Sequence, residues 1–247
     1  MKQFILTLLL TIVANTVLAQ NVQLHYDLGH ALQAGQLSER PDVTTTAEMF
    51  RSDALGNTFF FIDLDYYSSG MAGAYWEVSR EMNVSKNKRW AAHVEYDGGL
   101  TSNKALTHTT RFQQALLVGP AWNWHSADFS RTFSVQALYK YYLKGEMPYQ
   151  RPFSGFQLTE VWGVTFASGL CTFSGFCDLW YDSKVDGNLI LMSEPQFWFN
   201  LNTLKGWNDI HLSVGTEVEI SNNFIWTDSG RNDRFFAIPT LACKWTF

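Results

Sequence analysis

Aromatic and acidic residues alternate along one short segment of the chain. Phe59, Phe61, Asp63 and Asp65 occupy every second position, and such positions share one face of a β-strand. The two carboxylates would lie about 7 Å apart, so they could repel each other, bind a cation or pair with basic groups. Two aspartates do not supply the six to eight oxygens that Ca²⁺ takes, and the sequence identifies no accompanying nucleophile. We therefore expect neither a metal site nor catalysis here.

Other segments carry the same mixture of rings and carboxylates on one face. Such a surface suits a solute with a flat apolar face and hydrogen-bonding edges, such as a nucleoside, because rings stack on the face and carboxylates accept from the edges. The alternative is a water-filled lumen with solvated charges and rings that anchor the interfaces. The candidate solute-contacting residues are Phe59, Phe61, Asp63, Asp65, Tyr75, Glu77, Glu95, Asp178, Trp180 and Glu217.

Known catalytic patterns are missing from the sequence. It contains no Gly-x-Ser-x-Gly, no His-Glu-x-x-His and no glycine-rich phosphate loop. Cys171 and Cys177 would lie about 20 Å apart on one strand, too far for a disulfide. We expect no cofactor, no metal and no enzymatic activity.

The elements that position these residues are expected to be strands. Segments of period two recur with turn-like breaks between them, and their even number is typical of a bacterial transmembrane barrel. The sequence therefore predicts an all-β protein, a twelve-stranded antiparallel transmembrane β-barrel. The predicted strands span residues 22–28, 43–50, 58–67, 72–83, 90–97, 110–124, 129–143, 156–167, 171–182, 188–202, 209–226 and 234–247.

The connections alternate in length. Long polar connections follow the first, fifth and seventh strands, whereas those after the second, fourth, sixth, eighth and tenth strands are short, as expected for outer loops and periplasmic turns. Pro120, Pro195 and Pro239 fall inside predicted strands, so bulges or strand ends are expected there. Arg80 and Arg131 fall on the lipid-facing side, near the periplasmic end, where a charge costs only about 0–1 kcal/mol.

Both ends of the chain predict export to the bacterial outer membrane. Residues 1–19 resemble a cleavable signal peptide, which leaves residues 20–247 as the barrel domain. The final strand alternates up to Phe247, and a terminal aromatic residue is typical of barrels that the assembly machinery recognises. Ten Trp, ten Tyr and nineteen Phe would form the lipid-facing band and its girdles. Removing Lys2 leaves 17 basic against 23 acidic residues, a charge of −6, which argues against nucleic acid as a partner.

Several blocks resemble the Tsx-type nucleoside-channel superfamily, and in particular an outer-membrane branch of it with no assigned function. These blocks are Glu48 to Asp65, Gly73 to Glu81, His93 to Tyr96 and the terminal Trp245 to Phe247. The resemblance implies a twelve-stranded barrel with a narrow channel for nucleosides or similar solutes. The positions at which the resemblance implies contact with the solute are Phe59, Phe61, Asp63, Asp65, Tyr75, Glu77 and Glu95.

The function expected is passive uptake of small solutes, with nucleosides the leading candidates, by a monomer embedded in outer-membrane lipid. One alternative is an outer-membrane phospholipase or lipid-modifying barrel, which needs a Ser/His pair on the lipid-facing wall. The predicted register instead turns His25, His93 and His211 inward. Another alternative is a structural or adhesive barrel that binds partners through its loops. A soluble β-sandwich or lipocalin-like barrel would alternate similarly but would not need so many outward aromatics.

Overall fold

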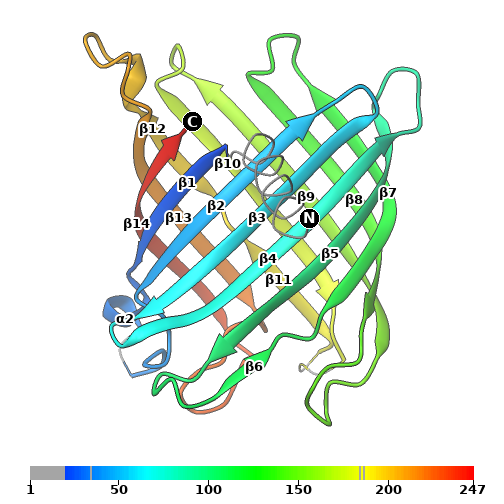
Figure 1. Ribbon diagram of the computed structural model, residues 1–247, viewed down its shortest axis with the longest axis vertical. Helices are drawn as coiled ribbons and strands as arrows, with labels where there is room; N and C mark the ends of the chain where they lie inside the picture. Colours follow the sequence, from blue (N-terminus) through cyan, green and yellow to red (C-terminus); the bar gives the residue numbers. More distant parts are fainter. Residues whose placement is uncertain (1–19, 34, 184, 186) are drawn as a thin grey trace, which may run out of the picture.

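The structure is a computed structural model that describes residues 20–247 except 34, 184 and 186. The predicted signal peptide, residues 1–19, lies outside the described residues. The chain forms strands and two short helical turns (Figure 1): β1 (Asn21–Asp27), α2 (Gly29–Leu32), β2 (Val43–Ser52), β3 (Gly56–Tyr67), β4 (Gly70–Asn83), β5 (Trp90–Ser102), β6 (Thr109–Arg111), β7 (Ala115–His125), β8 (Arg131–Tyr142), β9 (Phe153–Phe166), β10 (Cys171–Tyr181), β11 (Leu189–Ser193), β12 (Gln196–Asn200), η1 (Leu201–Thr203), β13 (Leu212–Asn222) and β14 (Phe235–Thr246).

All strands pair antiparallel and the sheet closes on itself. β1 pairs with both β2 and β14, and β10 pairs with β9 on one side and with β11 and β12 on the other. β6 and β7 pair with successive parts of β5, and β11 and β12 both lie between β10 and β13. Each of these two strand pairs, β6 with β7 and β11 with β12, therefore counts as one interrupted strand of the barrel. The predicted twelve-stranded antiparallel barrel is confirmed.

The outward faces of the strands are mostly apolar, whereas the inward faces carry most of the charged side chains together with two buried apolar clusters. Leu24, Val118 and Leu241 are 48%, 51% and 62% exposed on the outer wall, whereas the inward His25 and His93 are buried. This is the reverse of a water-soluble domain and matches a barrel surrounded by lipid. Charged side chains also occur on the outer wall: Glu160 points outward and is exposed in the middle of β9, whereas Arg80 and Arg131 lie nearer the strand ends. No helix within the described part of the chain is long and apolar enough to span a membrane.

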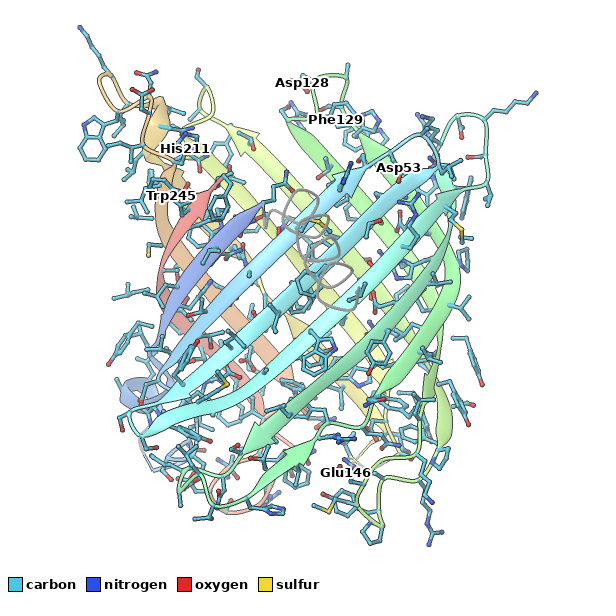
Figure 2. The ribbon with its side chains drawn as sticks, in the orientation of Figure 1. Asp53, Asp128, Phe129, Glu146, His211 and Trp245 are labelled. Atoms are coloured by element: carbon cyan, nitrogen blue, oxygen red, sulfur yellow. The ribbon has the colours of Figure 1, made fainter. Side chains whose placement is uncertain are left out.

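The two ends of the barrel differ in their connections. At the end where β1 begins and β14 finishes, here called the terminus end, the turns are mostly short; Asp53, Asp128 and Trp245 lie there (Figure 2). The opposite loop end carries the connections 28–42, 103–108, 143–152 and 223–234, and Glu146 marks it in Figure 2. The predicted alternation of long and short connections is therefore confirmed except after the tenth predicted strand, where the connection 201–211, which contains η1, is at least as long as the connection 143–152.

The three prolines behave differently from one another. Pro195 separates β11 from β12, as predicted. The expectation for Pro120 and Pro239 was wrong, because both lie inside continuous strands and neighbouring pairs keep their register across them. A proline removes a single N–H donor, and successive N–H groups in a strand point to alternate neighbours. Near Pro239 the hydroxyl of Thr240 accepts a hydrogen bond from the amide of Glu217 at 3.2 Å.

The arginines on the outer wall lie at the terminus end, as predicted. Arg80 makes two hydrogen bonds to Asp53, with Nη1–Oδ2 and Nη2–Oδ1 distances of 2.7 and 2.8 Å. Arg131 is the first residue of β8. Both positions lie near the barrel rim, where a guanidinium reaches water.

Asp128 organises the turn between β7 and β8. Its carboxylate accepts from the hydroxyls of Ser126 and Ser130, at 2.6 and 2.9 Å, and from the amide of Ser130 at 3.1 Å. These hydrogen bonds favour the ionised form and lower the pKa of Asp128 to about 2. Because the folded pKa is depressed, the turn's contribution to stability is present above about pH 4 and is lost as the pH falls towards 2. Carboxyl-carbon NMR should find its midpoint near 2, and a midpoint near 4 would contradict these contacts.

Candidate solute path in the barrel interior

The ten candidate residues all lie on inward faces. Cross-strand register places Asp63 opposite Tyr75, Phe61 opposite Glu77, and Glu77 opposite Asp97, so one continuous inner surface spans β3, β4 and β5. Asp178 on β10 interacts electrostatically with Glu77, although their strands are not neighbours in the sheet. An electrostatic interaction between strands that are not neighbours is expected where both side chains point into the barrel, and the inward faces predicted from alternation agree with this.

Four aromatic rings form a row along the interior. The centroid distances are 5.9 Å from Phe59 to Phe61, 5.9 Å from Phe61 to Tyr75 and 6.0 Å from Tyr75 to Phe112. Phe112 belongs to the connection between β6 and β7 and lies over Gly99, where a Cβ atom would come within 2.5 Å of its ring. Phe112 was not among the predicted site residues: it falls inside the predicted strand 110–124, which the structure breaks between β6 and β7 at this residue. We call Phe59, Phe61, Tyr75 and Phe112 the aromatic row.

An acidic group lies beside the aromatic row. One carboxylate oxygen from each of Glu77, Glu95 and Asp97 lies within 4.8 Å of the others. Lys140 approaches from β8, with its Nζ 3.2 Å from Asp97 Oδ2 and 2.7 Å from Gln157 Oε1. We call Glu77, Glu95, Asp97 and Asp178 the acidic cluster. Asp97 was absent from the predicted site, although its alternation with Glu95 placed it on the same face.

His93 connects this cluster to Glu81. Its Nε2 lies 3.1 Å from Glu95 Oε2 and its Nδ1 lies 3.4 Å from Glu81 Oε1. A histidine donates from both ring nitrogens only as the imidazolium, so this position suits a positive charge. Glu81 also accepts from the side-chain amides of Asn57 and Asn123 at 3.0 and 2.7 Å. His93 and Glu81 therefore form a hydrogen-bonded network rather than free ligands.

A second acidic group occupies the opposite wall. Glu217 accepts from Gln196 at 2.6 Å, and Asp63 and Glu194 interact with it electrostatically. Glu194 was missed because the break at Pro195 interrupts the alternation. Among the residues that the structure describes, inward carboxylates exceed inward basic groups, which are His25, Arg40, His93, Lys140 and Lys244. The carboxylates are those of Asp27, Glu48, Asp63, Asp65, Glu77, Glu81, Glu95, Asp97, Asp178, Glu194, Glu217 and Glu219.

The connection 28–42, here called the first loop, covers the interior at the loop end. Arg40 lies between Asp27 and Glu219, with Nε–Oδ2 and Nη2–Oε2 distances of 2.8 and 2.6 Å. Burial opposes its charge, but the two carboxylates outweigh burial and raise the pKa of Arg40 above its ordinary value. Leu37 is buried with Ile225, Phe236 and Ile238, so apolar packing and ion pairs together hold the first loop over the interior.

Trp180 and His211 differ from the other predicted positions. Trp180 is buried in a cluster with Leu117, Leu138 and Ile190, and its ring lies 5.4 Å from Lys140 Nζ. It therefore packs as part of the wall. The inward placement of His211 was wrong: it lies exposed at the terminus end, 5.8 Å from the outward ring of Trp245 (Figure 2). His211 precedes β13, so the alternation of that strand does not govern it.

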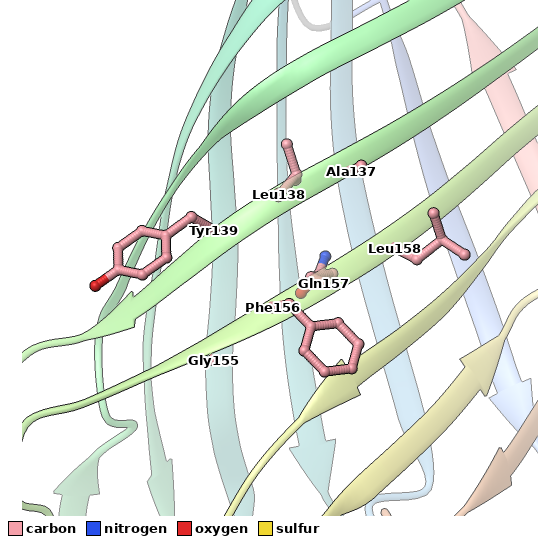
Figure 3. A pocket seen from close by; sticks show the side chains of 7 residues that line it. All are labelled: Ala137, Leu138, Tyr139, Gly155, Phe156, Gln157 and Leu158. Carbon is pink, nitrogen blue, oxygen red and sulfur yellow. The ribbon is translucent and has the colours of Figure 1, made fainter.

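A shallow cavity of about 440 Å³ lies on the outer wall between β8 and β9, not in the interior (Figure 3). The rings of Tyr139 and Phe156 flank it and are 52% and 48% exposed. An apolar depression on the lipid-facing surface fits a hydrocarbon chain. The candidate solute path therefore remains the polar interior.

Comparisons with known proteins show the fold and the family. No curated protein matches the sequence. Among solved structures, the NanC porin is similar with a TM-score of 0.54 and 10% identity, covering 92% of this chain and 98% of that one. LpxR from Salmonella typhimurium has a TM-score of 0.48 and 8% identity, covering 92% of this chain and 99% of that one. The KdgM porin has a TM-score of 0.47 and 9% identity, covering 92% of this chain and 98% of that one. The NanC likeness shows an outer-membrane barrel fold. Residues 19–247 match the family described as "Domain of unknown function (DUF5020)", and the chain belongs to that family.

Proposed function

We propose that this protein is a channel of the bacterial outer membrane that admits small solutes by passive diffusion, with nucleosides as the leading candidates. The observation that carries the proposal is the closed barrel with an apolar outer wall and an interior lined by rings and carboxylates. Such a wall is stable in lipid, and such an interior can replace part of a polar solute's hydration. The resemblance to a porin supports the architecture of a channel but does not select its solute.

The aromatic row supports a solute with a flat ring. Successive centroids about 6 Å apart allow a base to pass from one weak stacking contact to the next. Asp63 and Glu77 stand on the same inner surface and can accept hydrogen bonds from ring N–H groups and sugar hydroxyls. Passage is fast only when each contact is weak enough to release the solute, and separate stacking contacts meet that condition.

Liposome swelling with the purified protein tests the solute class. Nucleosides should enter faster than sugars of equal size, because only nucleosides present an aromatic face to the row. Equal rates for both would remove nucleosides from the proposal and leave a general channel. Protein-free liposomes give the background rate.

Replacing Phe61 tests the aromatic row directly. Phe61→Ala removes the ring that contacts both Phe59 and Tyr75. Loss of one stacking contact of about 1 kcal/mol should slow nucleoside entry about fivefold, while sugar entry should stay the same or rise. Phe173→Ala is the control, because Phe173 points outward from β10. A similar loss in both variants would show that the row does not guide the solute.

The interior histidines give no support to a lipid-hydrolysing alternative. His25 contacts Thr240 and Gln23 inside the barrel, and His93 contacts two interior carboxylates. Neither is placed to act as a base at the lipid-facing surface. The channel proposal therefore accounts better for these residues.

A further inference from the structure

The acidic cluster is more than a patch of solvated charge. Glu77 and Asp97 are a cross-strand pair on β4 and β5, and Glu95 lies two residues before Asp97 on the same face. These positions force three carboxylates together, with one oxygen of each within 4.8 Å of the others. Asp178 on β10 faces them from across the interior and interacts electrostatically with Glu77 and Glu95.

Two carboxylate oxygens in this cluster lack a hydrogen-bond donor. Asp97 is 5% exposed; its Oδ2 faces Lys140, but its Oδ1 is buried without a hydrogen-bond partner. Asp178 Oδ1 is also buried without one. Buried polar atoms in proteins are almost always satisfied by protein, water or an ion. Two such oxygens in one group of carboxylates are therefore open to a hydrogen-bond donor or a cation.

The surrounding charges indicate how much positive charge a bound partner would have to carry. Lys140 and His93 are the two basic groups in contact with the cluster in the described interior. His93 is shared with Glu81, and Lys140 contacts only the Oδ2 side of Asp97. Glu77 accepts one neutral hydrogen bond, from the Tyr75 hydroxyl at 2.8 Å. Four carboxylates with two partly shared cations leave a net negative charge of about two, which a divalent cation would balance.

We propose that Glu77, Glu95 and Asp97 bind a divalent cation through their carboxylate oxygens, with Ca²⁺ as the favoured ion and with Asp178 adding negative charge beside the site. An all-oxygen donor set selects a hard cation over zinc or copper. Carboxylates on two neighbouring strands, β4 and β5, give a one-sided, irregular arrangement, which Ca²⁺ tolerates and Mg²⁺ does not. Waters complete the coordination. The site is independent of which solute the channel admits.

Terbium luminescence tests the site in the folded full-length protein in detergent micelles. Tb³⁺ replaces Ca²⁺ in oxygen sites and emits when a nearby tyrosine or tryptophan is excited; Tyr75 contacts the ligand Glu77 directly. The expected result is a saturable signal that Ca²⁺ displaces at lower concentration than Mg²⁺. Equilibrium dialysis with Ca²⁺ should find one bound ion. A signal that Ca²⁺ does not displace, or the absence of bound Ca²⁺, would overturn the proposal.

Matched variants separate a defined site from general attraction to an acidic interior. Glu77→Gln and Asp178→Asn should each weaken binding at least about tenfold. The control Glu217→Gln makes the same change on the opposite wall and should bind as the wild type does. Equal losses in Glu77→Gln and Glu217→Gln would show diffuse attraction and overturn the proposal. Heat-dependent gel mobility shows that each barrel is folded, and Asp178→Asn provides the test if Glu77→Gln does not fold. Solute flux plays no part in these measurements, so their failure leaves the channel proposal intact.

Discussion

Arg40→Ala should open the loop end of the barrel and increase solute flux. The variant leaves Asp27 and Glu219, which now share one guanidinium, as uncompensated neighbours. Removing one partner of a partly buried ion pair costs about 3 kcal/mol. A cost of that size would shift the equilibrium between the closed and open positions of the first loop about a hundredfold towards the open one. The apolar packing of Leu37 and the hydrogen bonds of Ser38 with Asp228 and Lys104 would remain, but no charge would then tie the first loop to Asp27 and Glu219.

Planar-bilayer conductance and liposome swelling measure this effect. Arg51→Ala is the matched control, because Arg51 is exposed near the terminus end of β2. Arg40→Lys should recover only part of the closure, since an ammonium does not reproduce the fork of donors that spans two carboxylates. Wild-type conductance in Arg40→Ala would show that the first loop does not limit passage, and solute entry would then need another route past it.

Val118→Arg should destabilise the barrel strongly in a bilayer. Val118 is 51% exposed, lies on β7 and pairs with Val94 and Tyr139, which also face outward. An arginine on the lipid face costs about 2–4 kcal/mol near the bilayer midplane. On a water-exposed surface the same change would cost within about 0.5 kcal/mol. The prediction therefore tests which solvent surrounds the outer wall.

Urea unfolding in lipid vesicles, followed by tryptophan fluorescence, gives the free energy of unfolding. Met82→Arg is the depth control: Met82 is 43% exposed on the same outer wall but lies one residue from the end of β4, where the cost should be about 0–1 kcal/mol. Equal, small effects of the two variants would mean that water, not hydrocarbon, covers Val118. The membrane assignment would then be wrong.

Regular strands were predictable because their faces depend only on local alternation. Phe61, Asp63 and Glu77 could be placed inward from the sequence, since adjacent side chains in a strand point to opposite sides. Alternation gives no correct placement where the regular backbone stops. Glu194 lies in the break between β11 and β12, Phe112 lies between β6 and β7, and His211 precedes β13. For these residues no periodicity relates the side chain to the interior.

Arg40 shows a different limit. It lies in a long connection, and the sequence predicted only that this connection would be a long, polar outer loop. In the structure it reaches Asp27, thirteen residues away, and Glu219, 179 residues away. A contact of that sequence separation depends on the closure of the barrel, which brings β13 and β14 beside β1. No local pattern encodes it.

The sequence by itself determined that the chain forms strands, which side of each strand is apolar, and therefore that twelve strands close around a polar interior. Those properties follow from local alternation and from the solvents on the two sides of the wall. Only the tertiary structure decided which carboxylates meet, that the aromatic row is continuous through Phe112, and that the first loop covers the interior. These contacts join strands and loops that are distant in the sequence, and their distances are set by register, shear and closure of the whole barrel.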